Sequence, residues 1–180
     1  MKQRNTSIQH HAMYFGTYMG VYWILKFILF PLSFTIPFLT FLFIGLTLGV
    51  PFMGYYYLKI YRNKVCGGVI TFSQAFVFTA LVYLFASMLT AVAHFIYFQF
   101  IDQGLVLGHM QEQVNMLLEA NIDNPQYDFY DKTFNEAISY LSSLTATDIT
   151  LDNLSRNTFL GVLLAIPTAL IGRRKPKTDY

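Results

Sequence analysis

The sequence predicts an all-α fold, an integral membrane four-helix bundle with a helical extracytoplasmic loop between the third and fourth spans. Three observations support this prediction. The chain of 180 residues is 54% hydrophobic and 12% charged, whereas about 25% of the residues in a soluble domain are charged. Four apolar segments are each long enough to cross a bilayer. Nine of the ten acidic residues lie between Asp102 and Asp152. We expect residues 1–180 to form one membrane domain.

A helix needs about 20 residues to cross about 30 Å of hydrocarbon. The predicted spans cover approximately residues 13–30, 36–57, 72–101 and 157–172, and the outer helical insert covers approximately residues 102–155. The first helix is expected to stop before Pro31. The second has Pro37 near its start and Pro51 inside, which predicts a kink near Gly49–Pro51.

The other two spans have their own boundary signals. Thr71 and Gln74 have the spacing of a capping box, which predicts that the third helix starts there. The fourth apolar run is short, so its first turn is expected to include Leu151 and Leu154 at the outer interface.

The distribution of basic residues predicts the orientation. Nine of the twelve lie in three clusters, at Lys2 and Arg4, at Lys59, Arg62 and Lys64, and at Arg173, Arg174, Lys175 and Lys177. With four spans, all three clusters lie on one side of the membrane, and the positive-inside rule makes that side cytoplasmic. The short connection at 31–35 and the acidic insert are then outside. Nucleic-acid binding would need a basic face on a soluble module, so we do not expect it.

The acidic insert carries two helical patterns. Apolar residues recur at helical spacing at Leu107, Met110, Val114, Leu117 and Leu118, and Asn124-Pro125 breaks this helix. A second helix is predicted from a capping box at Thr133 and Glu136, with an apolar side formed by Phe134, Ala137, Ile138, Leu141 and Leu144. The insert is therefore either a hairpin that covers its own membrane bundle, which is the simpler interpretation, or a lid or docking site for an outside partner.

Small residues in the spans indicate close helix packing. They recur four apart at Gly16 and Gly20, at Gly45 and Gly49, and at Gly161, Ala165 and Ala169. This spacing lets helix backbones approach closely, either within one chain or across a dimer. We favour packing within the chain, because small residues are common in membrane bundles.

The third span carries a polar face, and the first carries a line of tyrosines. Polar residues three or four apart share one side of the third span, namely Thr79, Tyr83, Ser87, Thr90 and His94. These side chains either bond to neighbouring backbone or line a polar path. In the first span, Tyr14, Tyr18 and Tyr22 precede Lys26. Lys26 can snorkel to the outer interface, or join Tyr22 and His94 in a shallow polar spot.

No motif indicates catalysis or cofactor binding. The sequence has no HExxH, GxSxG or phosphate-binding loop, and no Cys/His spacing of a zinc site. The four predicted spans contain no Asp or Glu, which are common in ion-coupled carriers. We therefore expect no enzyme activity, no cofactor and no metal.

Several stretches resemble a bacterial membrane family known as domain of unknown function 4199. The resemblance rests on Ile70–Phe76 and Tyr97–Asp102, on Gly16 and Gly20, on the helical insert, and on the final span ending in Arg173-Arg174-Lys175. It covers nearly the whole chain and implies a four-helix protein of the bacterial inner membrane. It carries over no catalytic or ligand-binding residue.

Two functional hypotheses follow. In the first, the chain is a non-enzymatic assembly, scaffold or sensor component that acts through helix packing and its outer loop. In the second, it is a small oligomeric transporter or channel lined by the polar face of the third span. Both place the chain in a lipid bilayer, with a homo-oligomer or another membrane protein as the expected partner.

Overall fold

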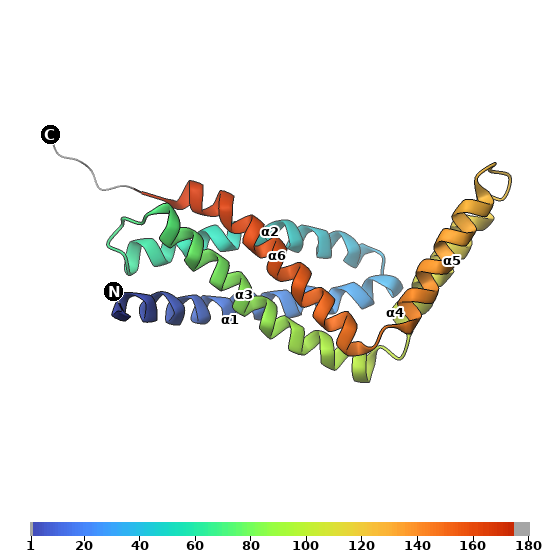
Figure 1. Cartoon of the computed structure of the whole chain (residues 1–180), viewed down its shortest axis with the longest axis horizontal. Helices are drawn as coiled ribbons and strands as arrows, with labels where there is room; N and C mark the ends of the chain where they lie inside the picture. Colours follow the sequence, from blue (N-terminus) through green and yellow to red (C-terminus); the bar gives the residue numbers. More distant parts are fainter. Residues whose placement is uncertain (1, 175–180) are drawn as a thin grey trace. The chain divides into compact units, whose positions relative to one another are not determined.

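The computed structural model describes residues 2–174, with side chains from Ile8 onward. The predicted basic residues Lys175 and Lys177, and the side chains of Lys2 and Arg4, lie outside the described part. The helices are α1 (Lys2–Thr35), α2 (Phe38–Lys64), α3 (Phe72–Ile96), α4 (Leu105–Glu119), α5 (Tyr127–Ser143) and α6 (Ala146–Gly172), and a π-helical segment, η1 (Tyr97–Ile101), continues α3 (Figure 1). The described residues contain no strand, so the all-α prediction is confirmed.

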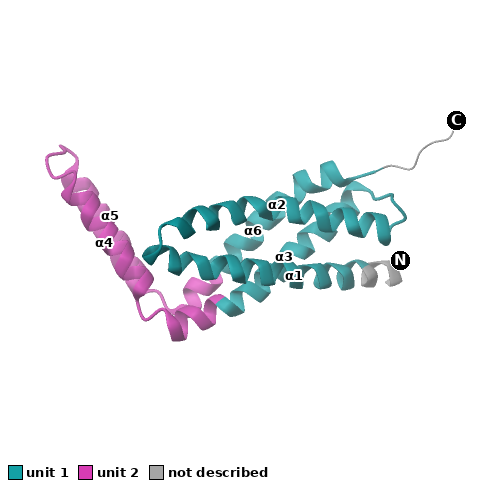
Figure 2. Ribbon diagram, turned by 180° about the vertical axis from the view of Figure 1, so that it is seen from behind, with its two compact units in different colours: residues 1–93, 152–180 teal, residues 94–151 magenta. Residues whose placement is uncertain are grey.

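The chain divides into two compact units (Figure 2). The first comprises residues 1–93 and 152–180, and the second comprises residues 94–151. The first unit contains α1, α2 and most of α3 and α6, which run alongside one another. The second unit contains η1, α4 and α5 and the adjoining ends of α3 and α6.

Four helical segments are long and apolar enough to cross a membrane. They comprise residues 8–35, 38–64, 72–101 and 146–172. At 1.5 Å per residue, a helix of 27 residues is about 40 Å long, which exceeds the hydrocarbon core. Large apolar side chains stand exposed on these helices; Phe41 and Phe52 of α2, for example, are 74% and 76% exposed. Lipid tails are the solvent that such a surface requires.

The first helix does not stop before Pro31, as the sequence analysis predicted. It continues through Pro31 to Thr35, and α2 begins immediately after Pro37. A proline removes one helical hydrogen bond, but in an apolar environment the remaining backbone groups still need partners, which favours continuing the helix. Ser33 Oγ also donates a hydrogen bond to the Phe30 carbonyl at 2.6 Å. The short connection therefore lies at residues 36–37 rather than 31–35.

The predicted capping box at Thr71 is confirmed. The Gln74 amide donates to Thr71 Oγ1 at 3.3 Å, and the Thr71 amide donates to Gln74 Oε1 at 3.4 Å. These bonds satisfy backbone donors that the first turn of α3 leaves free. From Phe72 the helix runs to Ile101, including its π-helical last turn.

The final helix begins earlier than its apolar run. A capping box that the sequence analysis missed joins Thr145 and Asp148 ahead of it. The Thr145 amide donates to Asp148 Oδ2 at 2.9 Å, and the Asp148 amide donates to Thr145 Oγ1 at 3.2 Å. The polar segment that contains Arg156 and Asp152, paired at 2.8 Å, is therefore also helical.

The second unit is built around a helical hairpin. Its first helix follows Gly104, which has a positive φ of 85°, and the Asp102 carboxylate accepts hydrogen bonds from the Gly104 and Val106 amides. The turn between α4 and α5 is held by Asn124 Oδ1, which accepts from the Gln126 amide at 2.9 Å. The predicted break at Asn124-Pro125 is thus confirmed.

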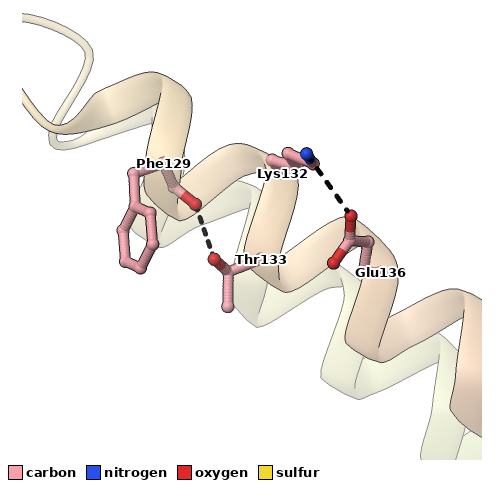
Figure 3. Close-up of polar contacts among 4 residues, drawn as sticks. All are labelled: Phe129, Lys132, Thr133 and Glu136. Carbon is pink, nitrogen blue, oxygen red and sulfur yellow. Dashed lines mark hydrogen bonds and ion pairs between the residues drawn. The ribbon is translucent and has the colours of Figure 1, made fainter.

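The predicted capping box at Thr133 and Glu136 is wrong. Helix α5 begins six residues earlier, at Tyr127, and both residues lie inside it (Figure 3). Thr133 Oγ1 donates to the Phe129 carbonyl at 2.7 Å, and Glu136 pairs with Lys132 at 3.9 Å. A threonine followed three residues later by glutamate also fits a helix interior, because its hydroxyl can bond to the carbonyl four residues back.

Candidate functional site

The polar face of α3 is buried. Thr79, Tyr83, Ser87, Thr90 and His94 are all less than 9% exposed. The hydroxyls of Thr79 and Thr90 donate to the carbonyls of Ala75 and Ala86, at 2.9 Å and 2.8 Å. Such bonds to the preceding turn satisfy polar side chains inside an apolar helix without a solvent path.

One polar pair on this face joins two helices. Ser87 Oγ lies 3.0 Å from Thr158 Oγ1 of α6 and also donates to the Leu84 carbonyl at 2.8 Å. Hydrogen bonds between spans contribute about 0.6 kcal/mol on average. The contact therefore helps to set the position of α6 against α3.

Tyr83 contacts all three other helices of the first unit. Its ring stacks on Trp23 of α1 with a centroid distance of 6.1 Å. A Cβ atom on Gly161 of α6 would lie 2.6 Å from the Tyr83 Cβ, and a Cβ on Gly54 of α2 would overlap the Tyr83 hydroxyl. The side chain is fully buried and thus occupies the space between the helices at this level.

Tyr22 and Lys26 make contacts between α1 and α2. Tyr22 donates its hydroxyl to the Leu46 carbonyl at 2.6 Å. The Lys26 ammonium lies over the rings of Trp23 and Phe43, 5.8 Å and 5.3 Å from their centroids, a cation–π arrangement. Tyr14 and Tyr18 pair through their hydroxyls at 3.0 Å and are exposed. His94, the third member of the predicted polar spot, belongs to the second unit.

The predicted small residues differ in their surroundings. A Cβ on Gly16 would lie 2.6 Å from the Phe85 Cβ and 3.0 Å from the Val82 carbonyl oxygen, and one on Gly20 would lie 2.9 Å from Leu89. Both glycines therefore allow α1 to approach α3 within one chain. A Cβ on Gly45, in contrast, would meet no atom within 4 Å.

The other small residues also pack within the first unit. A Cβ on Gly49 would meet the Tyr22 hydroxyl at 2.9 Å. Ala165 and Ala169 of α6 are fully buried, one and two turns beyond Gly161. The small face of α6 is therefore covered by the chain itself.

The sequence analysis missed a buried arginine at the basic end of the first unit. Arg62 is 4% exposed, and its Nη1 donates to the Gly172 carbonyl at 2.8 Å, at the last residue of α6. The backbones of Ile70 and Arg174 exchange hydrogen bonds of 3.1 Å and 3.0 Å beside it. The available signal was periodicity, since Arg62 falls four residues after Leu58 on the face that buries Val50 and Gly54.

Few side chains of the hairpin helices are fully buried. Leu118 is the one buried residue of α4 and α5, both of which are described throughout. Of the predicted apolar stripes, Met110, Leu117 and Ala137 are exposed, and the other members are buried or partly buried. Phe129 of α5, which lies outside the predicted stripes, is 66% exposed. A pair of helices encloses only part of its own apolar surface.

A cavity of about 230 Å³ lies between the two hairpin helices near their connecting turn. It is lined by Leu117, Leu118, Asn121, Asn124, Tyr127, Tyr130 and Phe134. The Tyr130 and Phe134 rings stack with a centroid distance of 6.4 Å, and Phe129 contacts Tyr130 at 5.8 Å. The hairpin thus combines an aromatic wall with a concave surface.

The hairpin unit is strongly acidic. Residues 94–151 contain eight acidic residues and one lysine, a formal difference of −7. Four of the acidic residues, Glu119, Asp123, Asp128 and Asp131, occur in the short stretch that also contributes the cavity lining. The surface therefore favours a cationic neighbour and disfavours an anionic one.

The comparisons with known proteins assign a family. Neither a curated protein nor a solved structure matches the chain. A family model described as "Protein of unknown function (DUF4199)" matches residues 14–174, which include the hairpin, three of the four long apolar helices in full, and the first of them from Tyr14 onward. The chain therefore belongs to the DUF4199 family.

Proposed function

We propose that the chain is a non-enzymatic, multi-pass protein of the bacterial inner membrane that anchors a docking hairpin outside the cytoplasm. In this role it acts as an assembly, scaffold or sensor component. The four long helices form the anchor, and α4 and α5 carry the recognition surface.

The proposed orientation has both termini in the cytoplasm. The basic residues at the end of α2 and after α6 come together, because Arg62 bonds to Gly172 and Ile70 pairs with Arg174. The acidic residues gather in the hairpin unit, between the third and fourth candidate spans. Basic residues flanking spans favour the cytoplasmic side, which supports this orientation.

The incomplete burial of the hairpin is the observation that carries the docking role. Exposed large apolar side chains on an extramembrane element can mark a surface that a partner covers. Here the exposed set comprises Met110, Met116, Leu117, Ile122, Phe129 and Tyr140. A protein partner that covered this set would supply the burial that the hairpin lacks.

The polar face of α3 gives little support to the alternative, a transporter or channel. Its threonine and serine hydroxyls bond to carbonyls of their own helix, and Tyr83 fills the space between helices. A conduit would need these groups to face water or a passing solute. The transport hypothesis thus requires an arrangement of helices other than the one described.

Photocrosslinking in native membranes tests the docking role. A photoreactive amino acid at Phe129 is expected to form a defined product with another protein, whereas the same group at Val92, an exposed position of α3, should meet lipid. Purified chain in liposomes should pass no solute, and Ser87→Ala should change nothing in that assay. Absence of any product from hairpin positions, together with a solute flux that Ser87→Ala alters, would favour transport instead.

A further inference from the structure

We propose that the cavity between α4 and α5 is a docking site for a cationic amphipathic peptide segment of an extramembrane partner. One apolar or aromatic side chain of that segment would enter the cavity, and neighbouring lysines or arginines would face the carboxylates around it. This inference rests on the docking role proposed above and names the chemistry of the partner.

The cavity has the size and lining of a pocket for a single anchor residue. Its volume of about 230 Å³ is below the range of about 300–1,000 Å³ that is usual for small-molecule sites. Three aromatic rings and two leucines line it. Buried aromatic and aliphatic anchors of this kind dominate the affinity of protein interfaces.

The acidic residues that adjoin the cavity lining in sequence favour a basic segment. Glu119 and Asp123 are exposed at the end of α4 and in the following turn, and Asp128 and Asp131 lie in the first turns of α5. The nearby Lys132 is paired with Glu136 at 3.9 Å. Aromatic rings also attract ammonium and guanidinium groups. The aromatic lining and the adjoining acidic residues therefore favour the same ligand chemistry.

The same charges argue against other occupants. These acidic residues would repel an acidic peptide, a nucleic acid or an anionic lipid headgroup. A second copy of the hairpin would bring two units together that each carry a formal difference of −7. Like charges across an interface are destabilising, so a basic partner is favoured over self-association of the hairpins.

Peptide binding to the full chain in nanodiscs of zwitterionic lipid tests the inference. The probe is a short fluorescent helical peptide with lysines on one face and leucines and one tryptophan on the other. Two comparison peptides replace either the lysines with glutamate or the apolar residues with serine, and empty nanodiscs give the background. We expect the lysine peptide to bind more tightly than either comparison peptide, with an affinity that falls as salt rises.

One substitution tests the cavity, and a pair of substitutions tests the acidic residues separately. Tyr130→Ala is expected to weaken binding by about tenfold, as for loss of an aromatic anchor wall. The pair Glu119→Gln and Asp123→Asn should weaken it by about threefold to tenfold, since exposed ion pairs contribute modestly. The control pair Glu112→Gln and Asp152→Asn removes the same number of acidic charges at residues that neither line the cavity nor adjoin its lining in sequence, and should leave the affinity within about twofold.

Several outcomes would overturn the inference. These are equal binding of the glutamate peptide, binding no stronger than to empty nanodiscs, or an affinity unchanged both by Tyr130→Ala and by the pair Glu119→Gln and Asp123→Asn. Crosslinks at Phe129 joining two hairpins would assign the surface to a second copy. If Tyr130→Ala leaves the crosslinked partner at Phe129 unchanged, the inference fails while the docking role stands. Absence of any crosslink from hairpin positions in the chain with Tyr130 intact would contradict the docking role itself.

Discussion

At the scale of single residues, the first unit depends on glycines placed where bulky side chains cross. Tyr83 lies between Gly54 and Gly161, and Phe85 lies against Gly16. In lipid, helix association relies on such close packing, because apolar side chains gain no hydrophobic free energy by leaving the hydrocarbon. The glycines of α1 and α6 therefore serve helix packing within one chain.

A matched pair of glycine substitutions tests this packing. Gly16→Ala places a methyl group 2.6 Å from the Phe85 Cβ, so we expect a loss of about 1–3 kcal/mol in the free energy of unfolding from overpacking. Gly45→Ala meets no atom within 4 Å and should be neutral or stabilising, because alanine favours helices. Thermal unfolding in mild detergent, followed by Trp23 fluorescence, measures both. Equal effects at the two positions would contradict the described contact of α1 with α3.

At the scale of elements, the ends of the helices are set by polar contacts. Arg62 holds the end of α6, and the capping box of Thr145 and Asp148 holds its start. The orphan carbonyls at a helix C-terminus carry partial negative charge, so a buried guanidinium is favourable there. The capping box at the start explains why α6 begins ahead of its apolar segment.

Removal of the buried arginine tests this helix end. Arg62→Met leaves the Gly172 carbonyl without its donor, and we expect a loss of about 1–3 kcal/mol in stability, as for an unsatisfied buried acceptor. Lys64→Gln removes a charge from the same cluster at an exposed position and should cost less than about 0.5 kcal/mol. Unfolding temperatures of the two variants provide the comparison. Similar temperatures would contradict a stabilising role for the contact between Arg62 and Gly172.

The two threonines with capping-box spacing are expected to differ as well. Thr145→Ala removes the acceptor of the Asp148 amide and should cost about 1 kcal/mol. Thr133→Ala lies within α5, where its hydroxyl bonds to the Phe129 carbonyl (Figure 3), and should change stability by less than about 0.5 kcal/mol. Amide hydrogen exchange at residues 146–149 reports the local effect. A larger loss for Thr133→Ala would restore the predicted helix start.

The sequence predicts the long helices better than their ends. Hydropathy identifies all four apolar helices, because a span must satisfy its backbone internally whatever its side chains are. Helix ends depend on individual contacts. The end of α1 predicted from Pro31 and the start of α5 predicted from Thr133 are therefore wrong. The polar face of α3 was likewise predictable from spacing, whereas its role as packed interior depends on α6 and α2, which hydropathy does not place. The sequence identifies Arg62 only as a topology signal. Its bond to Gly172 joins residues 110 apart, and a sequence pattern does not reveal such a contact.

At the scale of the whole molecule, charge and burial divide the chain in the same way. The first unit has an apolar exterior, a filled interior and a basic end where α2 meets α6. The second unit is acidic and leaves its apolar side chains incompletely covered. The proposed docking role and orientation require the acidic hairpin and the basic end of the first unit to lie on opposite sides of a bilayer.

Labelling of single cysteines in intact cells tests that arrangement most directly. In a Cys66→Ser background, one cysteine replaces Asp128 in the hairpin or Lys64 at the end of α2. We expect a membrane-impermeant maleimide to label Asp128→Cys in intact cells and Lys64→Cys only after the inner membrane is permeabilised. Labelling of both positions from the same side would contradict the account.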